Sequence, residues 1–196
     1  PLGFGANRVR SLPDGIARPA SSDDVRGLFD YARSSGARLI PYGGGTSVVG
    51  GVNPRPSDRP ALTVSLSRMT RLLDLDAVSG LARFEAGVAG PDIESQLAPH
   101  GYTLGHFPQS WELSTLGGWV MTRSSGQQSY YYGRMEDLFA GGSVETPSGP
   151  LDLPPHPASA AGPDLRQLIL GSEGRFGILT SAIVRVRRRP EVERFY

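Results

Sequence analysis

A glycine-rich loop at residues 41–51 places the strongest constraint on how this chain folds. The loop reads Pro-Tyr-Gly-Gly-Gly-Thr-Ser-Val-Val-Gly-Gly and follows a short apolar run at residues 38–40 that is typical of a strand. Three successive glycines let the backbone turn where a Cβ atom would collide, and such a turn can aim several N–H groups into one concavity. A concavity of this kind suits phosphate oxygens, and Thr46 and Ser47 add two hydroxyl donors. The loop alone fits either a diphosphate cradle or a flexible turn.

Two common nucleotide-binding motifs are excluded. A Walker loop needs a lysine after its last glycine, and this chain has no lysine, because all twenty of its basic residues are arginine. A Rossmann fingerprint needs Gly-x-Gly-x-x-Gly/Ala, but counted from Gly43 its last position falls on Val48, and no helical pattern follows. A dinucleotide held by this loop would therefore sit on a different fold.

The composition narrows the class of protein. A length of 196 residues suits one ordinary domain or two small lobes, and 26 glycines with 17 prolines indicate a loop-rich chain. A net charge of +1 gives no case for binding nucleic acid or a membrane surface. The absence of cysteine excludes disulfides, thiolate metal sites and cysteinyl cofactor links. Three scattered histidines argue against a zinc site, so we expect no metal.

Targeting signals, arginine usage and the first residue lead to expectations about the location and the source of the protein. No stretch reaches transmembrane length and no signal-peptide pattern opens the chain, so we expect a cytoplasmic protein. The complete preference for arginine over lysine suggests a GC-rich genome, and we suspect a bacterial source. Because the chain starts at Pro1 without an initiator methionine, we interpret it as a piece of a longer protein.

The first third of the chain is predicted to form a small β-α-β lobe. A helix begins at the N-cap candidates Ser21 and Ser22, has apolar residues at helical spacing and ends before Gly36. The next strand leads into the glycine loop, which thereby follows the carboxyl end of a strand, where α/β sheets commonly bind ligands. The expected elements are strands at residues 15–18, 37–41 and 61–66 and a helix at residues 22–35.

The rest of the chain is predicted to form a larger lobe with a mixed or antiparallel sheet flanked by helices. A strand pair joined by a turn at Ser79-Gly80, followed by a helix, differs from the first unit, so we place the change of lobe near residue 67. The domain would be α+β and span residues 12–190, with lobes at 12–66 and 67–190. The expected elements are strands at 71–76, 81–87, 138–145, 149–153 and 177–189, a helix from Gly90 to before Gly101, and a helix at 164–169.

Glycine, serine and aromatic residues crowd residues 105–133 with little periodicity. Such a stretch is costly to order, so in a compact domain it usually packs on something functional. Gly117 and Gly118 would let the backbone approach a ligand closely, whereas Trp119 is more typical of a core residue than of a ligand contact. The arginine run at 187–189 is typical of a solvated strand end, with an anion contact as the alternative.

Three separated segments carry a resemblance to a known family. They read Pro-Tyr-Gly-Gly-Gly-Thr-Ser at residues 41–47, Gln-Ser-Trp-Glu-Leu-Ser-Thr-Leu-Gly-Gly-Trp-Val-Met-Thr-Arg-Ser-Ser-Gly at residues 109–126, and Gly-Ser-Glu-Gly-Arg-Phe-Gly-Ile at residues 171–178. In order and separation they resemble the FAD-binding, PCMH-type domain of the vanillyl-alcohol oxidase superfamily. The resemblance covers essentially the whole chain.

The resemblance implies that all three segments bind FAD. Residues 41–47 would wrap the diphosphate, residues 109–115 and 122–125 would line the diphosphate, ribityl and isoalloxazine region, and residues 173–179 would lie along the adenosine or ribityl side. We expect Gly44→Val to abolish FAD retention while the chain stays folded. The cofactor-binding residues implied are Pro41, Tyr42, Gly43, Gly44, Gly45, Thr46, Ser47, Gln109, Ser110, Trp111, Glu112, Leu113, Ser114, Thr115, Gly118, Thr122, Arg123, Ser124, Ser125, Glu173, Gly174, Arg175, Phe176, Gly177, Ile178 and Leu179.

Within the superfamily, residues 117–126 resemble the alkylglycerone-phosphate synthase branch and its bacterial FAD-linked oxidase relatives. Their Trp-x-x-Thr-Arg-x-Ser-Gly form differs from the Gly-Gly-Asn and Ala-Thr-Asn-Ala-Gly-Gly runs of D-lactate and glycolate dehydrogenases. The chain departs from the synthase pattern at Gln109, often an acid there, and at Phe107, often glutamate. Thr46 stands where some relatives carry a histidine bonded to flavin, so we expect noncovalent FAD. By analogy His106 lies near the isoalloxazine; the alternative is a structural histidine hydrogen-bonded to backbone.

The synthase resemblance implies ether-lipid chemistry. In that branch FAD forms a transient adduct with the glycerone-phosphate unit while a fatty alcohol replaces the fatty acid, with no net redox change. The groups that deprotonate substrate belong to a cap domain and a C-terminal segment that we expect this chain to lack, so we name no catalytic residue and expect this piece alone to be inactive. Its partners would be a small-molecule substrate bound through the missing part and a second copy in a homodimer. The alternatives are an FAD-dependent 2-hydroxyacid dehydrogenase or other FAD-linked oxidase, and a noncatalytic nucleotide-binding module.

Overall fold

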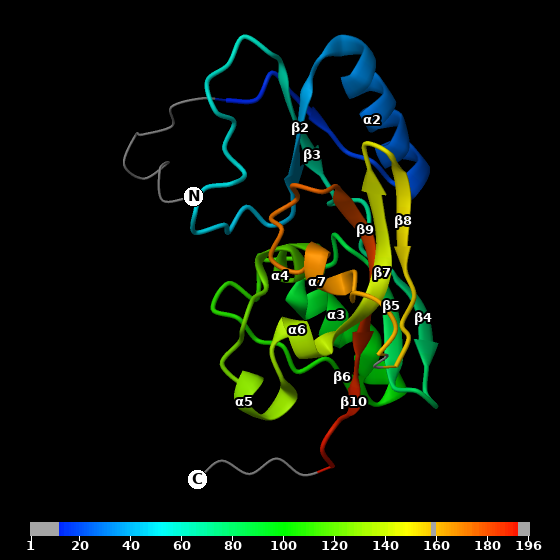
Figure 1. Cartoon of the computed structure of the whole chain (residues 1–196). Helices are drawn as coiled ribbons and strands as arrows, with labels where there is room; N and C mark the ends of the chain where they lie inside the picture. Colours follow the sequence, from blue (N-terminus) through cyan, green and yellow to red (C-terminus); the bar gives the residue numbers. More distant parts are fainter. Residues whose placement is uncertain (1–11, 158–159, 192–196) are drawn as a thin grey trace.

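The computed structural model describes residues 12–157 and 160–191. Their main elements are a three-stranded sheet and a five-stranded sheet (Figure 1). The smaller sheet is wholly parallel, in the order β1-β3-β2. The larger is antiparallel, in the order β4-β5-β9-β7-β8, and a short pair joins β10 to β6. The strands are β1 (Gly15–Ala17), β2 (Arg38–Tyr42), β3 (Ala61–Ser65), β4 (Leu72–Asp76), β5 (Leu81–Glu85), β6 (Tyr102–Thr103), β7 (Phe139–Thr146), β8 (Gly149–Leu153), β9 (Ile178–Arg185) and β10 (Arg187–Arg188).

The parallel sheet places its last strand in the middle. Thr63 of β3 lies opposite Ile16 of β1 on one side and Ile40 of β2 on the other. The helical crossover of the predicted β-α-β unit therefore joins two outer strands, and β3 fills the gap between them. This arrangement leaves the glycine loop at the carboxyl end of β2, as expected from the sequence.

Helix α2 (Ser22–Ser35) has the predicted bounds because both of its ends are capped. The Ser21 hydroxyl accepts a hydrogen bond from the Asp24 amide at 3.1 Å. At the other end Gly36 adopts a left-handed φ of 73° and its N–H donates to the Ala32 carbonyl at 2.9 Å. The local capping signals in the sequence were thus sufficient to place this helix.

Two arginines tie helix α2 to the larger sheet. Arg26 donates to both carboxylate oxygens of Glu145 on β7, at 2.9 and 3.2 Å, and the Glu145 side chain is only 4% exposed. This pairing with Glu145 raises the pKa of Arg26. Arg33 donates to the Pro147 carbonyl in the turn that follows β7. The helix of the parallel sheet is therefore anchored on the antiparallel one.

The predicted strand at residues 177–189 is two strands in different sheets. β9 ends at Arg185, and the next amide, that of Val186, donates to the Gly80 carbonyl before β10 begins. The arginines at 185 and 187 are exposed, as the alternating pattern predicted. The rest of β9 is buried on both faces, because it lies at the centre of the sheet with helices α2 and α4 (Leu116–Thr122) packed against it.

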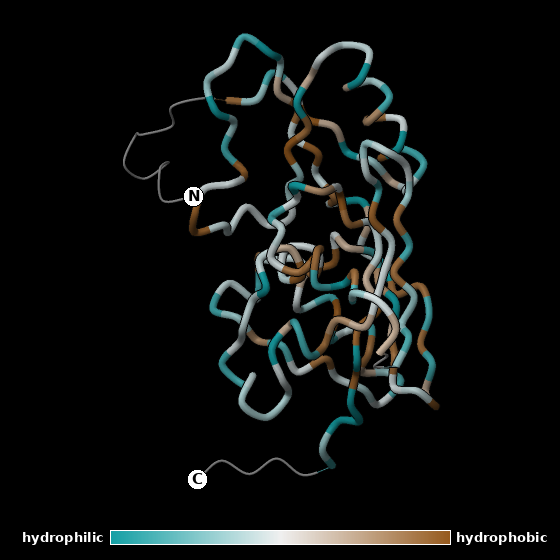
Figure 2. Tube along the Cα trace, viewed as in Figure 1, coloured by the Kyte–Doolittle hydropathy of each residue, from teal (hydrophilic) through white to brown (hydrophobic). Residues whose placement is uncertain are grey.

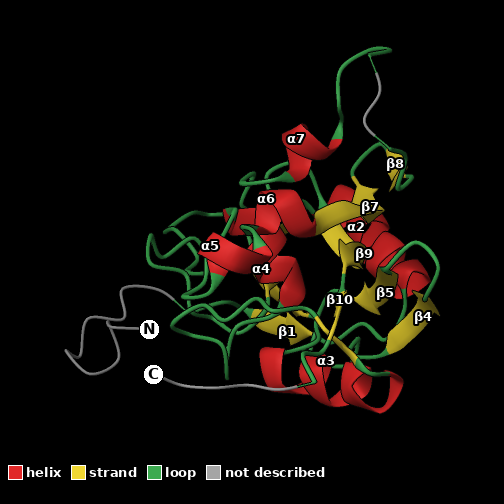
Figure 3. Cartoon of the chain, turned by 90° about the horizontal axis from the view of Figure 1, so that it is seen from below, coloured by secondary structure: helices red, strands yellow, loops and turns green. Residues whose placement is uncertain are grey.

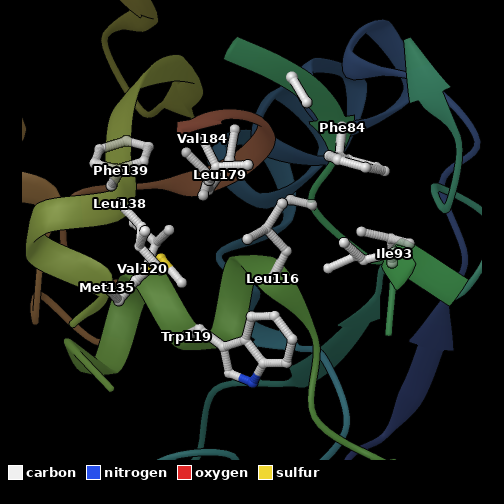
Figure 4. Packing of buried hydrophobic residues seen from close by; sticks show 14 of the residues in the cluster. Phe84, Ile93, Leu116, Trp119, Val120, Met135, Leu138, Phe139, Leu179 and Val184 are labelled. Atoms are coloured by element: carbon white, nitrogen blue, oxygen red, sulfur yellow. The ribbon is translucent and has the colours of Figure 1, made fainter. Parts of the chain in front are cut away.

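Helix α4 (Leu116–Thr122) is the main element that the sequence did not reveal. It begins at Thr115, whose hydroxyl accepts from the Gly118 amide. Leu116 points toward Leu179 of β9 and Phe84 of β5, and Val120 lies beside Met135 and Leu138 (Figure 4). A Cβ atom on Gly117 would come within 2.9 Å of the Ala86 carbonyl, so glycine allows this close approach. The same glycine pair lowered the helical signal, since glycine is a poor helix former.

The remaining helices are short and most lie on one side of the larger sheet. Figure 3 shows α4, α5 (Ser129–Tyr132) and α6 (Met135–Leu138) gathered on that side. Figure 2 shows hydrophobic residues along the strands and at α4. The predicted helix at 164–169 begins two residues later than expected. Within the described residues no helix combines the length and apolar character needed to cross a bilayer. The helices are α3 (Gly90–Leu97), the 3-10 turn η1 (Ala98–His100), α5 (Ser129–Tyr132), α6 (Met135–Leu138) and α7 (Arg166–Ile169).

Candidate functional site

A cavity of about 440 Å³ lies where the three glycine-bearing segments meet. The glycine loop forms one wall, residues 108–124 with helix α4 form a second, and the turn at residues 173–179 forms a third. The volume falls within the usual range of small-molecule sites, roughly 300–1,000 Å³. Segments that are far apart in the sequence thus share one trough.

Many of the residues predicted to bind the cofactor line this cavity. They come from all three segments, and the first segment lines it without a gap. The predicted residues in the lining are Pro41, Tyr42, Gly43, Gly44, Gly45, Thr46, Ser47, Ser110, Ser114, Thr115, Gly118, Thr122, Ser124, Glu173, Gly174, Gly177, Ile178 and Leu179.

The other predicted residues are not part of the lining within the described chain. Arg123 instead pairs with Glu136 at 3.3 Å and donates to Gln167. Trp111 packs against Phe107, with ring centroids 5.6 Å apart. A direct role for these positions as cavity residues therefore has no support from the geometry. They are Gln109, Trp111, Glu112, Leu113, Arg123, Ser125, Arg175 and Phe176.

The sequence reasoning also missed part of the lining. Val48 and Val49 follow the glycines directly and are exposed at 96% and 72%, so an apolar pair adjoining the motif was an available signal. Trp119, predicted as a core residue, is both buried and part of the cavity wall. The lining residues outside the implied set are Val48, Val49, Gly51, Val52, Leu66, Pro108, Trp119, Met121 and Gly117, of which Gly117 was expected to let the backbone approach a ligand.

The backbone amides of the glycine loop are available to a ligand. From residue 43 to residue 49 no N–H donates a hydrogen bond to any atom of the described chain. The first loop amide with a partner is that of Gly50, which donates to the Ser47 carbonyl. Consecutive unpaired N–H groups on one wall of a cavity match the oxygen atoms of an anion.

The three glycines are required by close packing as well as by the turn. A Cβ atom on Gly43 would overlap the Thr115 hydroxyl, and one on Gly44 would overlap the Leu113 carbonyl. Gly45 has a left-handed φ of 69°. The loop is thus pressed onto the 113–115 segment. This changes the expectation for Gly44→Val, because the added side chain would collide with backbone and disturb folding as well as binding.

Helix α4 contributes its residues to the wall but not its first amides. The Leu116 amide donates to the Val88 carbonyl at 2.9 Å, and the Gly117 amide donates to the Ala86 carbonyl at 2.7 Å. These donors are therefore already used by the end of β5 and the turn after it. Anion recognition in this cavity would depend on the glycine loop.

The cavity offers hydroxyl groups and almost no charge. The hydroxyls of Thr46 and Ser110 have no hydrogen-bond partner in the described chain, whereas Ser114 donates to the Ser110 carbonyl and accepts from the Trp119 indole. Among the described residues that line the cavity, Glu173 is the one carboxylate and none is an arginine. A bound anion would thus be held by neutral donors.

The third segment meets the first through a strained turn. Glu173 has a left-handed φ of 52°, and its amide donates to the Met121 carbonyl at 2.8 Å. A Cβ atom on Gly174 would come within 3.0 Å of Pro41. The turn therefore closes the cavity against the start of the glycine loop.

His106 lies directly behind the cavity wall. It is 1% exposed, and its ring contacts two lining residues: Nε2 is 2.7 Å from the Ser124 hydroxyl, and the ring meets Trp119 edge-on at 4.9 Å. Burial lowers the pKa of His106 to about 4, so the ring is neutral at neutral pH. The alternative of a histidine hydrogen-bonded to backbone is wrong, because its partner is a side chain.

Metal ligation finds no support in the described part of the chain. No cluster of three or more histidine, cysteine, aspartate or glutamate side chains there is placed to hold an ion.

The family model described as FAD binding domain matches residues 13–151. The chain belongs to this FAD-binding domain family. It is 41% identical over 185 residues to the alkyldihydroxyacetonephosphate synthase of Trypanosoma brucei brucei, covering 93% of this chain and 30% of that protein. It is 30% identical over 187 residues to an uncharacterised FAD-linked oxidoreductase of Escherichia coli (strain K12), covering 94% of this chain and 38% of that protein.

Solved structures agree with the sequence relatives. An alkyldihydroxyacetonephosphate synthase structure matches with a TM-score of 0.89 and 36% identity, over 97% of this chain and 35% of that one. The predicted resemblance and the α+β class are thereby confirmed. The FAD-binding domain described here spans about a third of the length of these relatives. The relatives come from both a trypanosome and a bacterium, so the bacterial source stays a prediction. The cytoplasmic location also stays a prediction.

The residues present fit FAD. The dinucleotide carries a diphosphate and a flat, largely apolar ring system. The cavity pairs a row of unused amides with apolar lining at Val48, Leu66, Ile178 and Leu179.

Proposed function

We propose that this domain holds FAD noncovalently in the 440 Å³ cavity, with the diphosphate on the amides of residues 43–49. The observation that carries this proposal is the uninterrupted run of loop N–H groups without an acceptor in the described chain. The hydroxyls of Thr46 and Ser110 add neutral donors at the same wall. When bound, FAD supplies the electron-transfer or adduct-forming chemistry, and the chain supplies binding and orientation.

The side chains at the site support noncovalent attachment. A covalent link to flavin needs a nucleophilic side chain, and the described lining residues include neither histidine nor cysteine. The tyrosine among them, Tyr42, has its hydroxyl against Gly45. The position at which some relatives carry a histidine is Thr46. His106 is shielded behind Trp119 and Ser124, and its Nε2 already contacts the Ser124 hydroxyl.

The roles of the three segments are part of the same proposal. Residues 41–47 would wrap the diphosphate, the lining residues between Ser110 and Ser124 would face the ribityl and isoalloxazine region, and residues 173–179 would lie along the adenosine or ribityl side. Ile178 and Leu179 are buried apolar residues in the lining and suit a flat ring face.

For the whole protein we propose activity of the alkylglycerone-phosphate synthase type, an acyl-to-alkyl exchange on glycerone phosphate. The 41% identity to the trypanosome synthase supports this choice. The groups that bind the substrate and the catalytic acid or base are expected in residues outside this domain, and a homodimer stays a prediction. A second candidate is the activity of an FAD-linked oxidoreductase, which the 30% identity to the Escherichia coli protein favours. Its substrate would be a 2-hydroxyacid.

The first test measures FAD binding by the purified chain. After incubation with FAD and gel filtration, the protein fraction should be yellow, and acid precipitation should release the flavin into the supernatant. Thr46→Val removes one unpaired hydroxyl without adding bulk and should weaken binding, while Gly27→Ala, in helix α2 with no neighbour within 4 Å of the new methyl, should not. A colourless protein that shows no heat of binding with FAD would refute the proposal and favour a noncatalytic module.

The second test separates the two activities in the full-length protein. Labelled fatty alcohol should be incorporated into acyl-glycerone phosphate without reduction of a dye. Dye reduction with D-lactate or glycolate, and no incorporation, would assign the oxidoreductase function instead.

A further inference from the structure

We propose that His106 is a positioning residue that holds the Ser124 hydroxyl with its proton directed into the cavity, as a donor to a hydrogen-bond acceptor of bound FAD. The inference rests on the proposed function, since it requires FAD in this cavity. It concerns two residues of which only Ser124 lines the site.

Ser124 has a fixed backbone and a side chain with a single partner. Its amide donates to the Trp119 carbonyl at 3.0 Å, and its carbonyl accepts from the Met135 amide at 3.1 Å. Its hydroxyl lies 2.7 Å from Nε2 of His106 and makes no other hydrogen bond within the described residues. The direction of the hydroxyl proton is therefore controlled by the histidine ring.

The second nitrogen of the ring decides which way this hydrogen bond runs. Nδ1 of His106 is fully buried and has no hydrogen-bond partner in the described chain. A neutral imidazole carries its proton on one nitrogen only. A proton on Nδ1 would be a buried donor without an acceptor, a situation that folded proteins rarely contain. A proton on Nε2 is satisfied by the Ser124 oxygen and leaves only a lone pair unpaired.

The hydroxyl of Ser124 then acts as an acceptor toward His106 and a donor toward the cavity. Because Nε2 already carries a proton, the proton of the Ser124 hydroxyl cannot point at it. The open side of Ser124 is the cavity that this residue lines. A donor held in advance binds an acceptor without losing rotational freedom at that moment. Such a donor matters here because the part of the lining that the structure describes contains no arginine. The acceptor would be an oxygen of the diphosphate or ribityl chain, or a carbonyl oxygen or ring nitrogen of the isoalloxazine.

The test compares FAD affinity across a matched set of variants of this chain, each checked for folding by circular dichroism. Ser124→Ala removes the donor and should weaken FAD binding by about five- to tenfold, the value of one neutral hydrogen bond. His106→Gln keeps an N–H donor near the position of Nε2 and should bind nearly as wild type does. His106→Asn places its amide near Nδ1 instead and should lose as much affinity as Ser124→Ala.

Non-additivity and the flavin spectrum separate this role from simple packing. In the Ser124→Ala background, His106→Asn should cause no further loss of affinity, whereas a purely structural histidine would give additive losses. A shift of the visible flavin band in Ser124→Ala would locate the acceptor on the isoalloxazine. An unchanged band with weaker binding would locate it on the diphosphate or ribityl chain. Either spectrum supports the donor role.

A measurement on the FAD-free protein tests the tautomer directly. In ¹⁵N-labelled protein the His106 ring, the buried one of three histidines, should show an unprotonated Nδ1 and a protonated Nε2 at neutral pH. A proton on Nδ1 would overturn the inference even if a variant fails to fold. If wild type binds FAD and Ser124→Ala and His106→Asn bind it equally well, the inference fails and the proposed function stands. If wild type itself does not bind FAD, both fail.

Discussion

The burial of His106 predicts a specific loss of stability in mild acid. Its pKa is about 4 in the folded chain, against 6.5 for an unperturbed histidine, because burial disfavours the charged ring. Between these two values the unfolded chain binds a proton that the folded chain does not. The contribution of His106 to stability is therefore complete above pH 6.5 and is lost as pH falls toward 4.

The size of the effect follows from the same two pKa values. At about 1.4 kcal/mol per pKa unit, the complete loss is about 3.4 kcal/mol, and roughly three-quarters of it develops by about pH 4.5. A loss of this size is a large part of the stability of a typical domain, about 5–15 kcal/mol.

Reversible urea unfolding of the FAD-free chain at several pH values between 7.5 and 4.5 measures this dependence. His106→Gln is the matched control, because glutamine keeps a donor toward Ser124 and does not titrate in this range. Wild type should lose about 2.5 kcal/mol more than the variant between the two ends of the range. Equal losses in the two proteins would show that the ring is not buried in its neutral form, and the reasoning would be refuted.

Three further predictions concern packing and buried charge. Gly44→Ala should lower the free energy of unfolding by about 1–3 kcal/mol and abolish FAD retention, because its methyl overlaps the facing backbone. Gly27→Ala, at an open position of helix α2, should instead raise the free energy of unfolding by about 0.5–1 kcal/mol. Urea unfolding measures both changes. Arg26→Leu should lower the melting temperature, since it leaves the Glu145 carboxylate buried without a partner. Adding Glu145→Leu should restore part of the loss. An Arg26→Leu variant as stable as wild type would contradict this. Burial opposes the ionisation of Glu85, but hydrogen bonds from Arg71 lower its pKa overall. Its contribution to the free energy of unfolding should therefore be present above pH 4.5 and be lost as pH falls below that value. In acid, the stability of Glu85→Gln should depend less on pH than that of wild type.

The sequence predicted those elements whose signals are local. Helix α2 was placed to the residue because its caps, Ser21 and Gly36, lie in the adjoining sequence. Helix α4 was missed because its glycines are set by the close approach to Ala86, a contact that exists only in the folded chain. The strand expected at 177–189 was continued too far, since its division at Val186 depends on the Gly80 carbonyl of a distant turn.

The candidate site was predicted to a similar extent and for similar reasons. The glycine motif identified the cavity wall at residues 41–47. Only glycine fits where the loop backbone packs closely against another segment, so this contact is visible in the sequence as glycines. Lining residues such as Leu66 and Met121 carry no such mark and resemble any core residue. Arg123, expected at the cofactor, pairs with Glu136 and is not among the lining residues, and this contact cannot be read from the sequence. The unpaired Nδ1 of His106 is likewise invisible in sequence.

The position of β3 between β1 and β2 has a consequence for how the domain acquires its structure during synthesis. Both outer strands leave the ribosome before the one strand with which they pair, since Ala61 begins the shared partner. Until β3 has emerged, β1 and β2 expose unsatisfied edges and have no parallel ladder to form. Slow translation or a pause in the loop that precedes β3 would therefore extend the period in which these edges are open to pairing with other chains.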